Sequence, residues 1–342
     1  MSKKLRILIN GFGRIGRAIT RINLEKDIFD LVAINDINND VNNLSYLLKY
    51  DSTYGRLNGR INIVDGILIL NNKKIKVYNY QSVKDVPLEV ENIDIIIDSS
   101  GQYVDAETIN YYSSKIKHYI VTNEPGNAKT IIMGVNEDKL VVNKDLYISS
   151  SICDSIAFVP IINQLLSEYR IVCGFLTTLH PWLGYQKLLD SSKIEGLNDV
   201  DGYALGRAAL PSVIPKSTSA INASARVLPE IGGKIESLSY RVPTTTVSTA
   251  VLNVTLNKSI DIDKLNNLFI NFTKKQKYQI MYLNYENLVS IDYSGFNYSS
   301  IIDIKWNKVL NNNNVQIVYW YDNEWGYCCR VLDLVDYITS KY

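Results

Sequence analysis

The sequence predicts an α/β protein: an N-terminal domain with a doubly wound parallel sheet, then an α+β domain with a mainly antiparallel sheet. Three observations predict it. A length of 342 residues is enough for about two domains, each with its own hydrophobic core. Before about residue 150, continuous apolar runs alternate with stretches of helical periodicity, which is typical of a parallel sheet covered on both faces. Beyond it, longer alternating runs indicate antiparallel strands.

The first half supplies the elements of the parallel sheet. A short β-branched run at residues 6–10 comes first, and apolar residues at helical spacing then predict a helix over residues 14–26. Further buried strands are expected at residues 31–34, 93–97, 119–121, 131–133 and 146–148. We therefore place the first domain at residues 1–150.

The second half of the sequence has a different pattern of apolar residues. Longer strands are expected at residues 173–179, 237–242 and 248–256. The apolar runs at residues 301–306 and 315–320, on either side of residues 311–314, suggest a hairpin. The end of the chain, residues 324–342, carries apolar residues at helical spacing, so it is expected to form an amphipathic helix. The second domain is placed at residues 151–323.

The composition excludes several classes of binding partner and of metal site. Lys+Arg 36 against Asp+Glu 35, a net charge of +1, gives no basic field for a nucleic acid or a membrane surface. No run reaches the length of a membrane span, and the N-terminus does not resemble a signal peptide. Four cysteines indicate a reducing, cytoplasmic setting, and with only two histidines no metal site is expected. Cys173 is expected in the core and His118 at a solvated helix end.

Residues 11–16 read Gly-Phe-Gly-Arg-Ile-Gly between the first strand and the first helix. In this G-x-G-x-x-G pattern the glycines allow a tight turn and close approach of a pyrophosphate, and the helix N-terminus offers free N–H groups to it. Asp36 follows the second strand, where a carboxylate accepts from an adenosine ribose and repels a 2′-phosphate. The pattern predicts a Rossmann-type domain that binds NAD rather than NADP. The predicted cofactor residues here are Gly11, Phe12, Gly13, Arg14, Ile15, Gly16 and Asp36.

Cys153 lies between the expected strand at 146–148 and a helix expected over residues 155–166. A helix N-terminus favours a thiolate, although on the local sequence alone a small buried cysteine is the favoured interpretation. His180 ends a strand, where a histidine is commonly structural. Taken together with an NAD site, the two residues suit aldehyde oxidation through a thiohemiacetal.

Six motifs in order make the sequence similar to the phosphorylating glyceraldehyde-3-phosphate dehydrogenases over nearly its whole length. They lie at residues 10–17, 49–53, 133–136, 177–180, 241–244 and 321–327. The resemblance implies an N-terminal NAD domain, a C-terminal catalytic domain, a final helix that packs back on the first domain, and a homotetramer. It also implies a phosphorylated aldehyde and inorganic phosphate as substrates.

The resemblance further implies roles for single residues. Cys153 would attack the aldehyde and His180 would act as its acid and base. Asn323 would hold the nicotinamide carboxamide, and Ser100 and Gly101 would form a turn beside the pyrophosphate. The implied substrate or phosphate residues are Thr218, Arg241 and Ser155.

The chain departs from the family beside the proposed nucleophile. The family motif is usually Ser-Cys-Thr-Thr-Asn, whereas here Ile152 and Asp154 flank Cys153, and Leu183 replaces a common threonine. A charge about 4 Å from the thiolate costs roughly 1 kcal/mol in a water-like dielectric, which raises the thiol pKa by about one unit. Two alternatives therefore stay open. One is a paralogue that acts on another aldehyde, such as erythrose 4-phosphate, or hydrolyses its thioester. The other is a non-catalytic NAD-binding interaction protein on the same fold.

Overall fold

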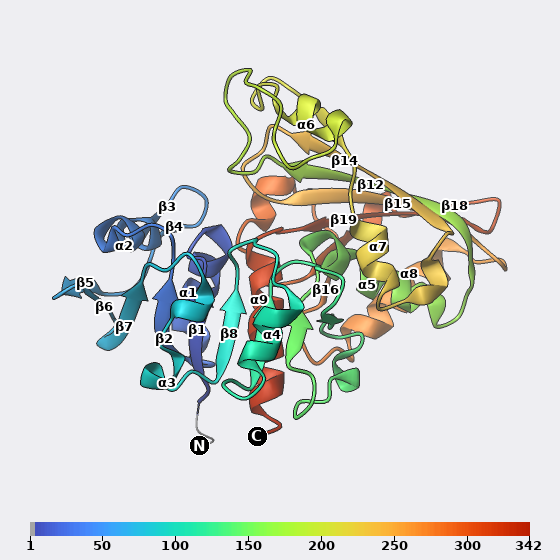
Figure 1. Ribbon diagram of the computed structural model, residues 1–342. Coiled ribbons are helices and arrows are strands. Elements are labelled where there is room, and N and C mark those ends of the chain that lie inside the picture. The colour runs from blue at the N-terminus through green and yellow to red at the C-terminus, as the bar shows by residue number, and fades with distance from the viewer. Residues whose placement is uncertain (1–3) are drawn as a thin grey trace. The chain divides into compact units, whose positions relative to one another are not determined.

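The computed structural model describes residues 4–342, which form two compact units. Of the described residues, those up to Ile152 together with Cys328–Tyr342 form the first unit, and Cys153–Tyr327 form the second. Each unit is built around one large sheet (Figure 1). Within the described chain, no helix combines the length and apolar character needed to cross a bilayer.

The first unit contains a sheet in the order β10-β11-β9-β8-β1-β2-β7-β6-β5. The pairings from β10 to β7 are parallel, and β6 and β5 extend the edge in antiparallel fashion. This confirms the predicted parallel N-terminal sheet. The strands are β1 (Arg6–Asn10), β2 (Asp30–Asn35), β5 (Ile61–Val64), β6 (Ile67–Leu70), β7 (Lys73–Tyr78), β8 (Ile95–Asp98), β9 (His118–Val121), β10 (Lys129–Thr130) and β11 (Tyr147–Ser149), with a separate pair β3 (Tyr50–Asp51) and β4 (Gly55–Arg56).

The helices of this unit begin with α1 (Arg14–Lys26), which has the bounds that the periodicity predicts. It ends where Asp27 takes a left-handed conformation, with φ of 51°. The others are α2 (Val41–Lys49), α3 (Leu88–Glu91), α4 (Ala106–Tyr112), most of α9 (Trp325–Thr339), and the 3₁₀ turns η1 (Val83–Asp85) and η2 (Glu137–Lys139). The closing helix α9 contacts α1, since Cys328 Sγ lies 3.7 Å from the Ile15 carbonyl.

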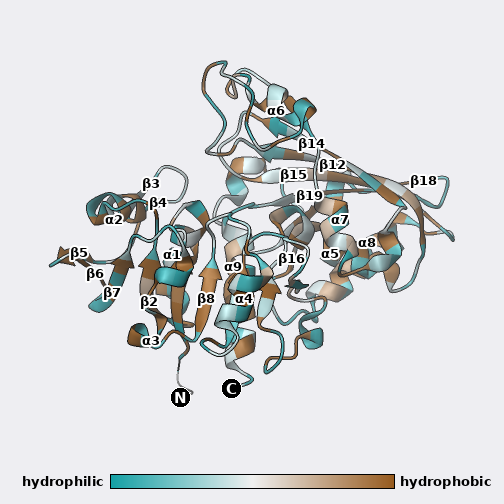
Figure 2. Ribbon diagram, viewed as in Figure 1, coloured by the Kyte–Doolittle hydropathy of each residue, from teal (hydrophilic) through white to brown (hydrophobic). Residues whose placement is uncertain are grey.

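The strand residues at the centre of the sheet are apolar and buried. Ile7, Leu8 and Ile9 of β1 are wholly inaccessible to solvent, and Figure 2 shows continuous hydrophobic colour along β1, β2 and β8. Burial on both faces explains why these strands appear in the sequence as unbroken apolar runs. The expected strand at residues 131–133 is wrong, because pairing stops at Thr130 and the chain turns at Gly134, with φ of 82°.

The second unit contains a mainly antiparallel sheet, as predicted, in the order β13-β14-β12-β15-β19-β17-β16, with β18 also paired to β19. The hairpin expected between residues 301–306 and 315–320 is partly wrong. Residues 301–306 belong to β17, which pairs antiparallel with β19, and to a 3₁₀ turn, but the strand that turns directly into β19 is β18. The strands are β12 (Ile171–Pro181), β13 (Ile214–Lys216), β14 (Ile235–Val242), β15 (Ser248–Leu256), β16 (Met281–Asn284), β17 (Ser300–Asp303), β18 (Lys308–Leu310) and β19 (Asn314–Tyr321). The helices are α5 (Cys153–Leu166), α6 (Asp199–Leu205), α7 (Ala220–Ala225) and α8 (Ile262–Thr273), with 3₁₀ turns η3 (Pro229–Ile231), η4 (Ser290–Tyr293) and η5 (Ile304–Trp306).

Two expectations about single residues are wrong. Cys173 is exposed rather than in the core, because it lies on the same face of β12 as the exposed Phe175. His118 is fully buried rather than at a solvated helix end, because α4 ends at Tyr112 and His118 begins β9. Its Nδ1 lies 2.9 Å from the Asp145 carbonyl, and burial lowers the pKa of this imidazole.

Candidate active site

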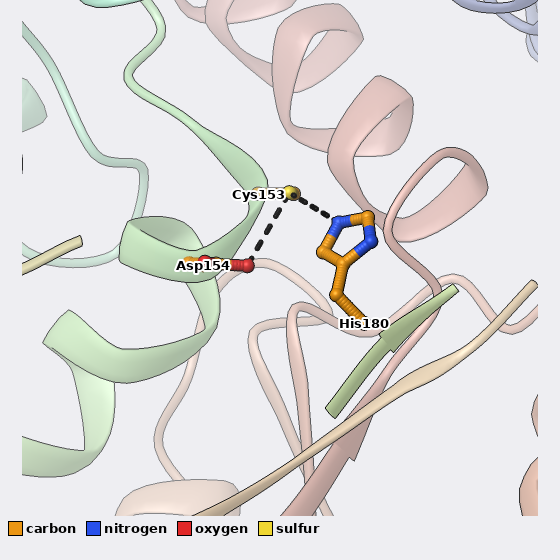
Figure 3. A group of neighbouring side chains, drawn as sticks. All are labelled: Cys153, Asp154 and His180. Atoms are coloured by element: carbon orange, nitrogen blue, oxygen red, sulfur yellow. Dashed lines mark hydrogen bonds between the residues drawn. The ribbon is translucent and has the colours of Figure 1, made fainter. Parts of the chain in front are cut away.

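The second unit brings together Cys153 and His180, 27 residues apart in the sequence. Cys153 is the first residue of α5, and His180 lies near the end of β12 (Figure 3). The distance from Cys153 Sγ to His180 Nε2 is 3.7 Å. On the other side of the ring, Nδ1 lies 2.8 Å from the Pro181 carbonyl, which can only accept, so Nδ1 carries the proton. The lone pair of Nε2 therefore faces the thiol.

His180 remains neutral over a wide pH range. It is 5% exposed, and burial followed by the positive charge of Arg241 lowers its pKa to about 4. At neutral pH the ring is therefore unprotonated and can accept a proton from the thiol, but its lowered pKa makes it a weak base.

Asp154 adds a carboxylate to the pair. Its Oδ1 lies 3.6 Å from Cys153 Sγ and accepts a 2.7 Å hydrogen bond from the Tyr321 hydroxyl, while Oδ2 accepts one of 3.2 Å from Thr218. Asp154 is buried, and Figure 3 shows its carboxylate beside the sulfur. Burial raises the pKa of the Cys153 thiol well above its usual value, and the charge of Asp154 raises it further. Arg241 acts in the opposite direction.

Two cations adjoin these groups. Arg241 of β14 stands opposite His180 in the parallel register of β12 and β14. It is 7% exposed, and its Nε and Nη1 have no hydrogen-bond partner among residues 4–342. Lys216 lies on β13, the strand beside β14, and its charge contributes to the lowered pKa of His180. Burial and then the charge of Arg241 lower the pKa of Lys216 itself. The two side chains provide positive charge and unused donors suited to an anion.

Sequence reasoning missed three contributors to this cluster. Lys216 was not singled out, although it lies two residues before Thr218 on a short strand. Tyr321 entered the sequence analysis only within the motif at residues 321–327, and Asp154 only as a charge that disturbs the thiol. No local signal identifies the bond from Tyr321 to Asp154, because 167 residues separate the two in the chain.

The predicted phosphate-site hydroxyls are not all accessible. Ser155 is fully buried, and its Oγ donates to the Ala220 carbonyl at 3.1 Å. Thr218 is half-buried, and its Oγ1 is already engaged with Asp154. Arg241 is thus the predicted anion-site residue that retains unused donors.

Asn323 lies just before α9 and is 7% exposed. Its side-chain Oδ1 has no hydrogen-bond partner within the described part of the chain. Because a buried carbonyl oxygen without a donor is costly, this atom is available to accept from a ligand amide.

The first unit contains a cavity of about 600 Å³ at the carboxyl ends of β1, β2 and β8. In the sheet order β1 lies between β2 and β8, which is the position where doubly wound folds bind their ligands. Of the predicted cofactor residues, Gly11, Gly13, Asp36 and Ser100 line this cavity. A side chain at Gly13 would meet no protein atom within 4 Å, whereas one at Gly11, with φ of 85°, would lie 2.5 Å from the Ser100 nitrogen.

The remaining residues of the glycine-rich turn support it rather than line the cavity. Phe12 is buried, and Arg14 forms an ion pair with Asp51. A Cβ at Gly16 would lie 2.4 Å from the Gly11 carbonyl oxygen, so only glycine allows this packing. Ile15 faces α9, where its carbonyl approaches Cys328.

The carboxylate of Asp36 is held at the cavity edge by backbone donors. Its Oδ2 accepts from the Phe12 N–H at 2.6 Å and its Oδ1 from the Asn38 N–H at 2.8 Å. Each carboxylate oxygen has a further lone pair, so both can still accept from ribose hydroxyls. Gly101, with φ of 74°, is exposed and does not line the cavity. The open space over Gly13 and the acceptor at Asp36 fit a dinucleotide.

The fold and these residues define a two-unit α/β protein with a dinucleotide-type turn in one unit and a thiol–imidazole pair in the other. Residues 5–106 match the family model described as glyceraldehyde 3-phosphate dehydrogenase, NAD binding domain, and residues 152–323 match that of the C-terminal domain. The chain is 34% identical over 333 residues to a glyceraldehyde-3-phosphate dehydrogenase of Sclerotinia sclerotiorum, covering 97% of this chain and 96% of the relative. It is 33% identical over 341 residues to glyceraldehyde-3-phosphate dehydrogenase 2 of Bacillus subtilis, covering 99% and 98%. The chain belongs to the glyceraldehyde 3-phosphate dehydrogenase family.

Proposed function

We propose that this protein catalyses the NAD-dependent, phosphorylating oxidation of glyceraldehyde 3-phosphate to 1,3-bisphosphoglycerate, in a reversible reaction. The observation that supports it most directly is the 3.7 Å separation of Cys153 Sγ and His180 Nε2, with the imidazole held by Pro181 in the tautomer that accepts a proton. We also propose that the first unit binds the cofactor, that the second carries the chemistry, and that the protein is a cytoplasmic homotetramer.

The chemistry begins with transfer of the Cys153 thiol proton to Nε2 of His180. The thiolate then attacks the aldehyde carbon, and the resulting oxyanion takes the proton from His180 to give a hemithioacetal. NAD, when bound, would supply the hydride acceptor for this carbon. His180 removes the hydroxyl proton in the same step, and a thioester on Cys153 results.

Inorganic phosphate then attacks the thioester carbon. The carbon–sulfur bond breaks, the Cys153 thiolate leaves, and the acyl phosphate is released. Arg241 and Lys216 would hold this phosphate or the substrate phosphate, because their charges adjoin the thiol and Arg241 keeps two unused donors.

In the first unit, the backbone at Gly11 and Gly13 would face the pyrophosphate of a bound dinucleotide, and Asp36 would accept from its adenosine ribose. In the second unit, the unpartnered Oδ1 of Asn323 would suit an amide donor such as the nicotinamide carboxamide. The carboxylate at Asp36 favours NAD over NADP.

A second function is favoured by specific contacts. Ser155 and Thr218, the two hydroxyls implied for phosphate, are used by the Ala220 carbonyl and Asp154, and Ile152 offers no hydroxyl. These contacts fit an enzyme that oxidises another aldehyde, such as erythrose 4-phosphate, or one whose thioester is released to water.

One assay separates the readings: NADH formation from glyceraldehyde 3-phosphate and from erythrose 4-phosphate, each with and without inorganic phosphate. Phosphate-dependent turnover of the triose supports the first function. Preference for the tetrose, or acid formation without phosphate, supports the second. Absence of turnover while NAD still binds would refute both and leave the non-catalytic interaction protein.

A further inference from the structure

Three metal-ligating side chains meet at one point of the second unit. Cys153 Sγ, a carboxylate oxygen of Asp154 and a ring nitrogen of His180 all lie within 4.8 Å of one another. Asp154 is the residue that adds a third donor to the cysteine and histidine (Figure 3). We propose that these residues form a Zn²⁺ site with three protein ligands and an open fourth position.

The distances correspond to those of a tetrahedral zinc centre. With Zn–S of about 2.3 Å and Zn–N or Zn–O of about 2.05 Å, the tetrahedral angle places sulfur about 3.6 Å from each of the other ligand atoms. The distances here are 3.6 Å from Sγ to Asp154 Oδ1 and 3.7 Å from Sγ to His180 Nε2. The third edge, between Asp154 and His180, is no longer than 4.8 Å and would shorten to about 3.3 Å on metal binding.

The surrounding contacts orient each ligand as zinc sites require. Metal-bound histidines donate their other N–H to a carbonyl or carboxylate, and Nδ1 of His180 lies 2.8 Å from the Pro181 carbonyl. Ligating carboxylates are themselves hydrogen-bonded, and Asp154 accepts from Tyr321 and Thr218.

Charge and ligand type favour zinc over hard cations. A thiolate, a carboxylate and a neutral imidazole sum to −2, which Zn²⁺ cancels within a largely buried cluster, and sulfur and nitrogen donors select against Mg²⁺ and Ca²⁺. Arg241 and Lys216 add positive charge at the same place. Their charges favour an anion, such as hydroxide or phosphate, as the fourth ligand.

Zinc would occupy the sulfur lone pair that attacks a carbonyl compound and the Nε2 lone pair that accepts the thiol proton. The sulfur lone pair and Nε2 of His180 cannot bind zinc and activate the thiol at the same time. The site therefore makes the thiol of Cys153 unreactive while zinc is bound and restores it when zinc is removed. This holds whatever substrate the protein uses.

The test uses Co²⁺ as a spectroscopic substitute for zinc with the whole chain, without oxygen. One equivalent is expected to give a thiolate-to-cobalt charge-transfer band and strong visible absorption typical of four-coordinate cobalt, both displaced by Zn²⁺. Asp154→Asn is expected to weaken binding at least about tenfold, whereas Cys173→Ser, which removes an exposed thiol of the same unit, leaves it unchanged.

Two outcomes would overturn the proposal: no charge-transfer band in the wild-type protein, or equal affinity in Asp154→Asn. Should that variant fail to fold, wild-type protein alkylated at Cys153 is tested with Co²⁺ instead. The thiolate-to-cobalt band must then disappear, and a band that persists would overturn the proposal. Tyr321→Phe, which keeps all three ligands, is expected to bind cobalt about tenfold more weakly and retain the band. None of these measurements depends on turnover, so they stand apart from the proposed function.

Discussion

Asp154→Asn is the most informative single change, because it removes one charge beside the thiol and keeps the side-chain shape. In the wild-type protein Asp154 Oδ1 lies 3.6 Å from Cys153 Sγ. The substituted amide can still accept from Tyr321 and approach Thr218, so the change tests charge rather than packing.

The magnitude follows from Coulomb's law. Two unit charges at that 3.6 Å separation repel by about 1 kcal/mol in a water-like dielectric and about 4–5 kcal/mol at an effective dielectric constant of about 20. At 1.36 kcal/mol per unit, the Cys153 pKa should fall by about one to three units. Burial, the larger cause of the raised pKa, is unchanged, so the thiol remains above its ordinary value.

The assay is the rate of carboxamidomethylation of Cys153 against pH, with a chelator present and in a Cys173→Ser background. The thiolate fraction rises with the fall in pKa, but nucleophilicity decreases with a Brønsted slope of about 0.5. The net expectation at neutral pH is an increase of roughly 3- to 30-fold, with the midpoint of the pH profile moved to lower pH.

An unchanged midpoint would refute the electrostatic reasoning. Tyr321→Phe is the matched control, because it removes a bond to Asp154 and leaves the charge in place. If both variants react faster by the same factor, loosening of the site rather than charge explains the effect.

Outcomes are expected for four further tests, of which the first compares two glycine variants. Gly13→Ala should weaken NAD binding at least about tenfold in a titration, because its Cβ would enter the open cavity, and should change the free energy of unfolding little. Gly11→Ala should lower the free energy of unfolding, measured by urea denaturation, by about 2 kcal/mol or more. Asp36→Asn should reduce the preference for NAD over NADP in competition binding, and equal preference in both proteins would contradict the ribose contact. Cys153→Ser should reduce NADH formation at least about a thousandfold and leave NAD affinity nearly intact. The imidazole of His180 binds a proton more readily in the unfolded chain than in the folded protein, so the stability of the protein falls as pH falls from 6.5 to about 4. In His180→Asn the urea midpoint of unfolding should depend less on pH over this range. Equal pH dependence of the midpoints in the two proteins would contradict this prediction.

The sequence alone determined the parts of this protein that neighbouring residues control. Apolar runs and helical spacing predicted the parallel sheet and the bounds of α1, because each strand or helix imposes its period on adjacent residues. The glycine-rich turn followed from the same local logic, since the positive φ of Gly11 and the contact of Gly16 with the Gly11 carbonyl involve only residues of the turn itself.

Only the tertiary structure decided how the candidate site is composed. Asp154 meets Tyr321 across 167 residues, and Lys216 and His180 come together because β13 and β12 both pair with β14. Ser155 turns inward to the Ala220 carbonyl, although a motif placed it beside phosphate. Such contacts depend on strand order and side-chain direction, which arise only when distant segments pack, so no local pattern in the sequence encodes them.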